Sequence, residues 1–186
     1  MAKKQEQQQQ PQNLDSNGVY ILMDQITMAS CKEAIRWIMN HNLSANPLPQ
    51  LTIIINSPGG DVHAAFALID VMKSSDIPIK TVGLGLIASC GFLIFIAGQK
   101  GKRILTPNTS ILSHQYSWGS KGKEHELYAR VKEFELSTER MISHYKKCLG
   151  MTEAKIKEIL LPPQDVWLSA NEAKKLKICD KVEELY

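Results

Sequence analysis

Apolar residues along this chain change their spacing from one segment to the next, and each spacing predicts a different element. Residues 51–55 read Leu-Thr-Ile-Ile-Ile, an apolar and β-branched run typical of a strand buried on both faces of a parallel sheet. Residues 28–40 instead place Ala34, Trp37 and Ile38 on one side of an amphipathic helix. The first third of the chain therefore carries both strand and helix periodicities.

The rest of the chain continues this alternation, with turn-forming Gly, Pro, Asn and Asp between the periodic segments. Further strands are predicted at residues 19–23, 79–82, 103–105 and 110–114, and further helices at residues 64–72, 91–97 and 124–149. Such an alternation is typical of a layered α/β domain. We expect one domain over residues 17–186, preceded by a flexible glutamine-rich arm over residues 1–16.

The predicted helix over residues 124–149 is the longest element. Its apolar residues recur at alternating spacings of four and three, which aligns them along one side of the helix: Leu127, Val131, Phe134, Thr138, Met141, Tyr145 and Cys148. One hypothesis is that this side packs on the core of the same chain. The other is an assembly surface, because Tyr128 and Ile142 widen the stripe, and the pattern leaves both hypotheses open.

Charge and cysteine content narrow the function classes. The 22 basic and 19 acidic residues are dispersed, without the block of like charge that follows nucleic-acid phosphates, so we expect no nucleic-acid partner. The four cysteines show no CxxC spacing, and the N-terminus lacks the apolar run of a secretory signal. We therefore expect free thiols and a cytoplasmic or equivalent reducing compartment, such as plastid stroma or infected-host cytoplasm.

Residues 81–98 carry no charge and approach the length of a membrane-spanning helix. Gly83, Gly85 and Gly91 interrupt this run, which predicts a buried strand and a short core helix and no membrane contact. The chain contains neither GxxxxGK[ST] nor GxGxxG, so no phosphate-cradling loop is indicated. We expect no cofactor and no metal.

Ser89 stands where the uncharged run changes from strand to helix. A hydroxyl there gains the partial positive charge of the helix N-terminus and lies near backbone N–H groups able to stabilise an oxyanion. The simpler interpretation is a helix N-cap. A buried cap is less expected here, because the surrounding residues are apolar.

Two further residues suit proton transfer. His114 ends a predicted strand, and although a lone histidine is usually a surface or core residue, a serine partner would make it a base. Ser169, with Glu172 three residues later, forms a capping box for the last helix. This leaves Asp165 without a local structural role unless it is a solvated turn residue. Gly59 and Gly60 follow a buried strand and allow close approach of the main chain to another group.

Several separated motifs, in this order, resemble those of the Clp peptidase family. They are Ile55-Asn56-Ser57-Pro58-Gly59-Gly60, Gly85-Leu86-Ile87-Ala88-Ser89-Cys90-Gly91, Ala97-Gly98 with Lys100-Gly101-Lys102-Arg103, Leu105 with Pro107-Asn108, His114-Gln115, and Leu168-Ser169-Ala170 with Glu172-Ala173. The resemblance covers residues 19–186. It implies an α/β, crotonase-like fold of stacked β-sheets and helices with a protruding handle helix, assembled as two stacked heptameric rings.

The resemblance also implies roles for individual residues. Ser89 would be the nucleophile, His114 the base and Asp165 the group that orients the base, while the backbone N–H groups of Gly60 and Cys90 would form the oxyanion hole. Extended peptides would add as a strand along Gly59, Asp61, Val62, Gln115 and Tyr116. The implied function is ATP-independent peptide hydrolysis on unfolded chains that an AAA+ unfoldase supplies.

The chain departs from the family pattern in four places. Cys90 follows the nucleophile where the family usually has methionine, and residues 116–119 replace a proline and a glycine-rich turn, which leaves substrate preference open. Pro163-Gln164 stands where an Asp-Arg pair commonly links the rings, so ring stacking would either rely on the helix over residues 124–149 or be weaker. The glutamine-rich arm replaces the usual axial gate.

Three alternatives stay open from the sequence. The chain would be a non-catalytic or regulatory ring subunit if the triad were idle, or a crotonase-type acyl-CoA enzyme on the same architecture. Cys90 would be the nucleophile in place of Ser89 if its thiol were activated.

Overall fold

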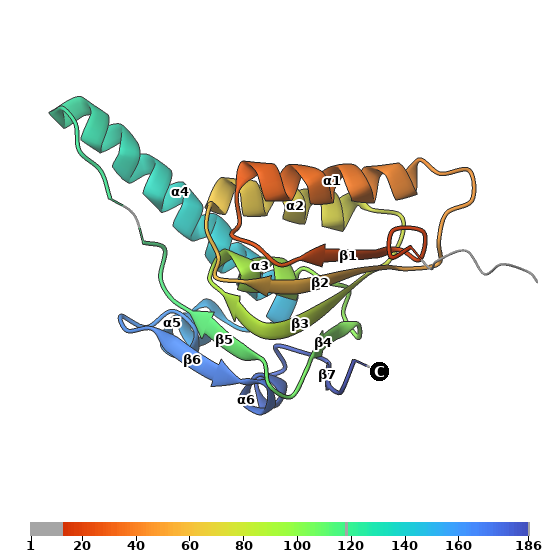
Figure 1. The fold of residues 1–186 in the computed structure, drawn as a ribbon. Coiled ribbons are helices and arrows are strands. Elements are labelled where there is room, and N and C mark those ends of the chain that lie inside the picture. Colours follow the sequence, from red (N-terminus) through yellow and green to blue (C-terminus); the bar gives the residue numbers. More distant parts are fainter. Residues whose placement is uncertain (1–12, 118, 186) are drawn as a thin grey trace, which may run out of the picture.

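The computed structural model describes residues 13–117 and 119–185 and is built around one seven-stranded sheet. Its main path runs β1-β2-β3-β4-β7, and neighbouring strands on this path are parallel (Figure 1). These strands are β1 (Val19–Leu22), β2 (Leu51–Ser57), β3 (Ile79–Ala88), β4 (Arg103–Leu105) and β7 (Lys181–Val182). As the apolar run over residues 51–55 predicted, β2 lies between two parallel neighbours.

Two further strands of the same sheet, β5 and β6, pair with the end of β3 and position the candidate site. β3 pairs with β4 over residues 81–83 and then continues, so that residues 86–88 pair in parallel with β5 (Ser110–Ser113). β6 (Val166–Ser169) pairs antiparallel with β5. The carboxyl ends of β3 and β5 therefore lie side by side, and the start of β6 lies beside the end of β5.

The described residues also form six helices. They are α1 (Met28–Asn42), α2 (Val62–Ser74), α3 (Cys90–Ile96), α4 (Glu124–Leu149), α5 (Glu153–Ile159) and α6 (Ala170–Lys175). Figure 1 shows α1 and α2 together on one side of the sheet. Side-chain caps begin several of them: Thr27 caps α1, Asp61 caps α2, and the predicted capping box of Ser169 and Glu172 opens α6.

The predicted α/β alternation is confirmed, and four differences have local causes. β3 extends to Ala88, six residues past the predicted end, because Gly83 and Gly85 continue the strand instead of ending it. A Cβ on Gly83 would lie 2.6 Å from a Leu105 methyl group, so this glycine allows close strand packing. α5, β6 and β7 were not predicted, since elements of seven, four and two residues carry little periodicity.

Residues 81–98 form the end of β3 and all of α3, as their glycines indicated. All seven residues of α3 are buried. Among the described helices, none is both long enough and apolar enough to cross a bilayer. The predicted arm over residues 1–16 lies largely outside the described residues, which begin at Asn13 with a turn leading into β1.

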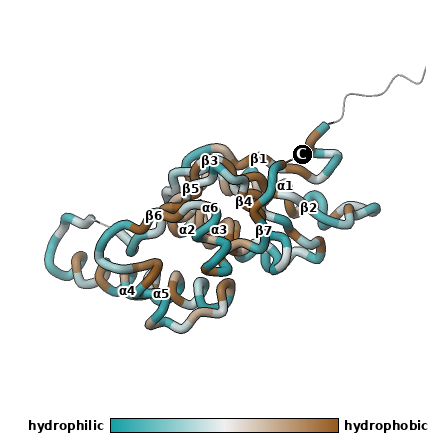
Figure 2. Tube along the Cα trace, turned by 90° about the horizontal axis from the view of Figure 1, so that it is seen from below, coloured by the Kyte–Doolittle hydropathy of each residue, from teal (hydrophilic) through white to brown (hydrophobic). Residues whose placement is uncertain are grey.

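The two hypotheses for the stripe on α4 apply to different halves of the helix. Met141 and Tyr145, in the second half, are buried against the core. In the first half, Leu127, Tyr128 and Val131 are 36%, 70% and 44% exposed, and Figure 1 shows this half projecting away from the sheet. Hydrophobic and hydrophilic segments alternate along α4 in Figure 2. The projecting half therefore carries apolar side chains that residues 13–117 and 119–185 leave uncovered.

A buried histidine fastens the second half of α4 to the core. His144 Nε2 lies 2.8 Å from the Leu93 carbonyl oxygen and donates to it, and His144 Nδ1 accepts from the Lys73 ammonium at 3.0 Å. Both ring nitrogens are thus satisfied by a neutral imidazole. Burial, which disfavours the charged form, lowers the pKa of His144 to about 4, and the nearby Lys73 charge acts in the same direction.

This lowered pKa predicts a loss of stability in mild acid. The unfolded chain protonates His144 below its ordinary pKa near 6.5, whereas the folded chain resists protonation down to about 4. The free energy of unfolding therefore falls as the pH drops from 6.5 to 4, by up to about 3 kcal/mol from this group. Urea denaturation of the wild type and of His144→Asn at pH 7 and 4.5 measures the difference.

The exposed His125, changed to Asn, serves as the matched control, because its loss leaves the wild-type pH dependence in place. A His144→Asn variant that loses as much stability between pH 7 and pH 4.5 as the wild type would contradict this account of the buried imidazole.

Candidate active site

Ser89 occupies a strained turn between β3 and α3. Its backbone has φ 52° and ψ −119°, and Lys177 is the one other non-glycine residue with positive φ in the described part of the chain. Such a conformation costs about 1–3 kcal/mol and persists only where the surroundings hold it. Here the Ser89 N–H donates to the Leu112 carbonyl at 2.9 Å, and the Ser89 carbonyl accepts from Phe92 at 3.0 Å.

Ser89 occupies the N-cap position of α3, but its side chain makes no capping hydrogen bond to the helix, so the interpretation of its hydroxyl as a cap is wrong. A hydroxyl on a sharp strand-to-helix turn is held at the N-terminus of the helix yet left free to react. The strained backbone therefore orients the Ser89 hydroxyl, and this hydroxyl does not help to start the helix.

Gly59 brings a second backbone segment against Ser89. A Cβ on Gly59, where φ is 93°, would lie 2.6 Å from Ser89 Cβ and 2.9 Å from the Ala88 carbonyl oxygen. Only glycine permits both this approach and this conformation. The close approach of the main chain to another group, predicted for the paired glycines, is confirmed: Gly59 approaches the turn that carries Ser89, and Gly60 approaches the backbone of Ile26.

Gly60 directs its peptide groups toward the same turn. The Gly59 carbonyl accepts from Ile26 N–H at 2.8 Å, and Asp61 N–H donates to the Ile26 carbonyl at 2.8 Å. In an extended segment successive residues direct their polar groups to opposite sides, so the N–H and C=O of Gly60 face away from Ile26. Consistent with this, the Gly60 carbonyl accepts from Cys90 Sγ at 3.2 Å.

The Cys90 thiol is buried and donates a hydrogen bond in this arrangement. Cys90 is 5% exposed, and burial, the largest effect, raises the pKa of its thiol. Reactive cysteines need the opposite, an electropositive and accessible setting that lowers the pKa. The geometry therefore favours Ser89 over Cys90.

The pairing of β3 with β5 brings His114 beside Ser89. Ala88 pairs with Leu112, so Ser89 is level with Ser113 and His114 follows directly. Ser89 and His114 line one small cavity of about 20 Å³. His114 Nδ1 lies 2.6 Å from the Gln115 carbonyl oxygen, and since a carbonyl only accepts, Nδ1 carries the proton. In the neutral imidazole, Nε2 is then left unprotonated and able to accept the serine proton.

Asp165 is placed by its strand but does not contact His114. Ser113 pairs with Val166 in the antiparallel β5–β6 ladder, so the next position of the same register sets Asp165 opposite His114. The Asp165 side chain is exposed, and among the described residues it forms no ion pair with His114 within 4.0 Å. The Gln115 carbonyl takes the place at Nδ1 that a carboxylate would fill. The structure thus brings Ser89 and His114 together and leaves Asp165 adjacent but disengaged.

Sequence reasoning missed the apolar walls of this cavity. They are formed by Val62, Leu93, Tyr116, Met141 and Tyr145. Tyr145 is 2% exposed and its hydroxyl lies 3.3 Å from Ser113 Oγ, which in turn donates to the Leu160 carbonyl at 2.6 Å. Burial raises the pKa of Tyr145, so its hydroxyl stays protonated. Met141 and Tyr145 both belong to the apolar stripe on α4, so the spacing of that stripe is the one sequence signal that could have identified them as walls of the cavity.

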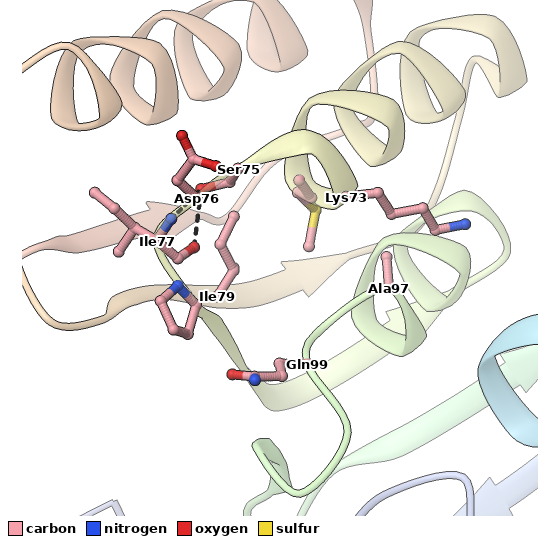
Figure 3. Close-up of a pocket in the computed structure, with 9 residues that line it drawn as sticks. Lys73, Ser75, Asp76, Ile77, Ile79, Ala97 and Gln99 are labelled. Carbon is pink, nitrogen blue, oxygen red and sulfur yellow. Dashed lines mark hydrogen bonds between the residues drawn. The ribbon is translucent and has the colours of Figure 1, made fainter.

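A separate cavity of about 280 Å³ lies at the other end of β3 (Figure 3). It is lined by Met72, Lys73, Ser75, Asp76, Ile77, Pro78, Ile79, Ala97 and Gln99. Ile79 begins β3 and Ala88 ends it, so roughly 30 Å of strand separates this cavity from Ser89. Figure 3 shows the Lys73 ammonium directed away from Asp76, so these two charges do not form a reactive pair.

Comparison with known proteins places the chain among peptidases. The family model described as Clp protease matches residues 2–185. The ATP-dependent Clp protease proteolytic subunit 1 of Chlamydia trachomatis serovar D is 33% identical over 171 residues, which cover 91% of this chain and 87% of the relative. The ATP-dependent Clp protease proteolytic subunit of Deinococcus radiodurans is 32% identical over 139 residues, covering 75% of this chain and 67% of the relative.

Proposed function

This chain belongs to the Clp protease family and is a serine endopeptidase of that type, and on this premise we propose that Ser89, His114 and Asp165 are its catalytic triad. The observation that supports this most strongly is the shared cavity of Ser89 and His114, in which the Nδ1 proton of His114 is committed to a carbonyl. A base whose Nε2 is unprotonated, placed beside a serine hydroxyl, is the first requirement of acyl transfer.

The proposed reaction uses these groups in sequence. His114 Nε2 takes the Ser89 proton as Oγ attacks the peptide carbonyl carbon, and the resulting imidazolium gives that proton to the leaving amine. The backbone N–H groups of Gly60 and Cys90 donate to the oxyanion, a role supported by the outward direction of the Gly60 peptide groups and by the position of Cys90 at the start of α3. Water then hydrolyses the acyl-enzyme by the same steps.

Asp165 completes this proposal by replacing the Gln115 carbonyl at His114 Nδ1. The β5–β6 register already sets Asp165 across from His114, so side-chain rotation and a small shift of the strand end suffice. We assign this shift to ring assembly, in which contacts between chains move the start of β6 relative to the end of β5. The isolated chain is then a latent form of the enzyme.

Assembly into two stacked heptameric rings is part of the proposal. The uncovered apolar residues on the projecting half of α4, Leu127, Tyr128 and Val131, support a contact between rings there. Peptides add as a strand along residues 59–62 and 115–116, which flank Ser89. An AAA+ unfoldase supplies unfolded chains, as the words ATP-dependent in the relatives' names suggest. The four free cysteines fit a reducing compartment.

Neither alternative function is favoured. The relatives are named proteolytic subunits, which speaks against a non-catalytic ring subunit. An acyl-CoA enzyme has less support, since Ser89 beside His114 suits a covalent acyl intermediate.

Fluorophosphonate labelling tests the proposal directly. The assembled protein, with its mass measured in solution, is treated with the reagent and digested, and the adduct is located by mass spectrometry. We expect a single adduct on Ser89, together with cleavage of short peptides in the absence of ATP. An assembled, folded sample that neither labels nor cleaves would refute the proposed function.

A further inference from the structure

Basic side chains from separate segments of the chain converge on a cavity of about 480 Å³ that is distinct from the one at Ser89. It lies where the C-terminal ends of α4 and α6 meet the turn before β4. Small-molecule sites usually measure about 300–1,000 Å³. Five lysines line this cavity: Lys100, Lys147, Lys174, Lys175 and Lys177. The fold therefore gathers positive charge that the sequence disperses.

A buried ion pair between Arg103 and Asp180 fixes the floor of this cavity. Arg103 is 3% exposed, and its Nη2 and Nε donate to the two Asp180 carboxylate oxygens at 2.8 and 3.0 Å. The same carboxylate accepts from the backbone N–H groups of Gly101 and Arg103 at 2.8 and 2.9 Å. Arg103 Nη1 donates to the Cys148 carbonyl at 3.2 Å, which fastens the end of α4 to this floor. The Asp180 carboxylate is thus committed to Arg103 and Gly101 and does not balance the lysine charges.

The five lysines have no carboxylate partner in the part of the chain that the structure describes, since none of them belongs to an ion pair there. The Lys174 ammonium donates to the Asp180 backbone carbonyl, which leaves its charge unbalanced. Glu172, the acidic residue of α6, accepts from the N-cap residue of its own helix instead. Burial raises the pKa of the Cys148 and Cys179 thiols on the cavity wall, so they stay protonated and add no negative charge. The cavity therefore has a surplus of positive charge.

The helix ends at this cavity account for only a small part of that surplus. Lysines in the last turn of a helix balance the negative end of its dipole, which carries about half an elementary charge, so two helix ends balance roughly one lysine. Lys100 lies in a turn and belongs to no helix. Lys177 follows α6 in the left-handed conformation, with φ 60°, at a position where glycine usually ends a helix. The chain thus keeps a strained backbone at a residue whose side chain lines the cavity.

We propose that this cavity binds a short chain of linked phosphates, either an inorganic oligophosphate or the phosphate tail of a nucleotide. The inference goes beyond the proposed peptidase function and does not depend on the chemistry at Ser89. Lysine ammonium groups bind phosphates as point charges, and a concave site lined by one sign of charge concentrates ions of the opposite sign. Linked phosphates carry several charges in a compact chain, so they reach lysines from both helix ends at once. A single phosphate reaches fewer of them, and an acidic peptide carries its charges farther apart.

Isothermal titration calorimetry of the assembled protein with inorganic tripolyphosphate tests this site. We expect binding that weakens as salt is added, because salt screens exposed charges. The double variant Lys147→Gln, Lys177→Gly should bind about tenfold more weakly or worse, since it removes two charge-assisted contacts. Glycine suits the backbone at residue 177, so this variant should keep its thermal stability. Lys32→Gln, Arg36→Gln removes the same charge from α1, outside the cavity, and should bind like the wild type.

Parallel titrations with magnesium-free ATP, AMP and hexaglutamate identify the ligand class. Equal affinity for tripolyphosphate and ATP supports a site that recognises phosphates alone, tighter binding of ATP supports a nucleotide site, and AMP should bind about tenfold more weakly than ATP or worse. Absence of tripolyphosphate binding, unchanged affinity in the cavity variant, or equally tight binding of hexaglutamate overturns the inference. Fluorophosphonate labelling and peptide hydrolysis of the same samples report on Ser89 separately, so failure of this site leaves the proposed function standing.

Discussion

We expect Ser89→Ala to reduce peptide hydrolysis by at least roughly 10⁴-fold, because a triad that has lost its nucleophile retains only the modest rate supplied by oxyanion stabilisation and binding. Labelling by fluorophosphonate should disappear at the same time. The variant should still fold and assemble, since the Ser89 side chain makes no capping bond to α3 and the alanine keeps the backbone bonds to Leu112 and Phe92.

Cys90→Ala is the matched control for this experiment. Cys90 contributes a backbone N–H to the proposed oxyanion hole, and alanine retains it, whereas the thiol interacts with the Gly60 carbonyl and the Ser89 side chain. We expect Cys90→Ala to keep its labelling and to remain measurably active. If hydrolysis survived in Ser89→Ala and vanished in Cys90→Ala, a cysteine mechanism would replace the one described here.

The second large effect is expected at Asp165. Asp165→Asn keeps the size of the side chain but removes the charge that stabilises the imidazolium, and its amide favours the wrong tautomer of His114, so kcat should fall by roughly 10⁴-fold. Steady-state hydrolysis of a short peptide by the assembled enzyme measures this. Assembly and thermal stability should change little, since the Asp165 side chain is exposed.

Asp76→Asn serves as the control for the Asp165 variant. Asp76 is also exposed, but it lies near the start of β3, at the far end of the strand from Ser89. Its kcat should match that of the wild type. An Asp165→Asn enzyme within about tenfold of the wild type would mean that the Gln115 carbonyl, and not Asp165, orients His114 during catalysis.

The parts of the site that the sequence predicts are those encoded by local pattern. Ser89 was found because an uncharged strand gives way to an apolar helix at that residue, and Gly59 and Gly60 because paired glycines follow a buried strand. The α/β alternation followed from the change between strand and helix periodicity. Each of these signals needs only neighbouring residues.

The rest of the site depends on contacts between distant segments. Ser89 and His114 meet because β3 continues past β4 and then pairs with β5. The sequence did not predict this continuation, because the glycines in β3 are typical of the end of a strand. The stripe on α4 could not show which of its residues are buried, because the projecting half and the buried half have the same spacing. Likewise, the stack of Tyr116 on Phe134 follows from the packing of α4 beside β5 and from no local motif.

The central claim, one proton-transfer chain from Ser89 through His114 to Asp165, is tested most directly by the structure of the phosphonate-labelled, assembled protein. The account predicts an Asp165 carboxylate oxygen within about 2.6–3.2 Å of His114 Nδ1, with the bond to the Gln115 carbonyl broken. An assembled and labelled enzyme in which Nδ1 still donates to Gln115, while Asp165 remains turned to solvent, would contradict it.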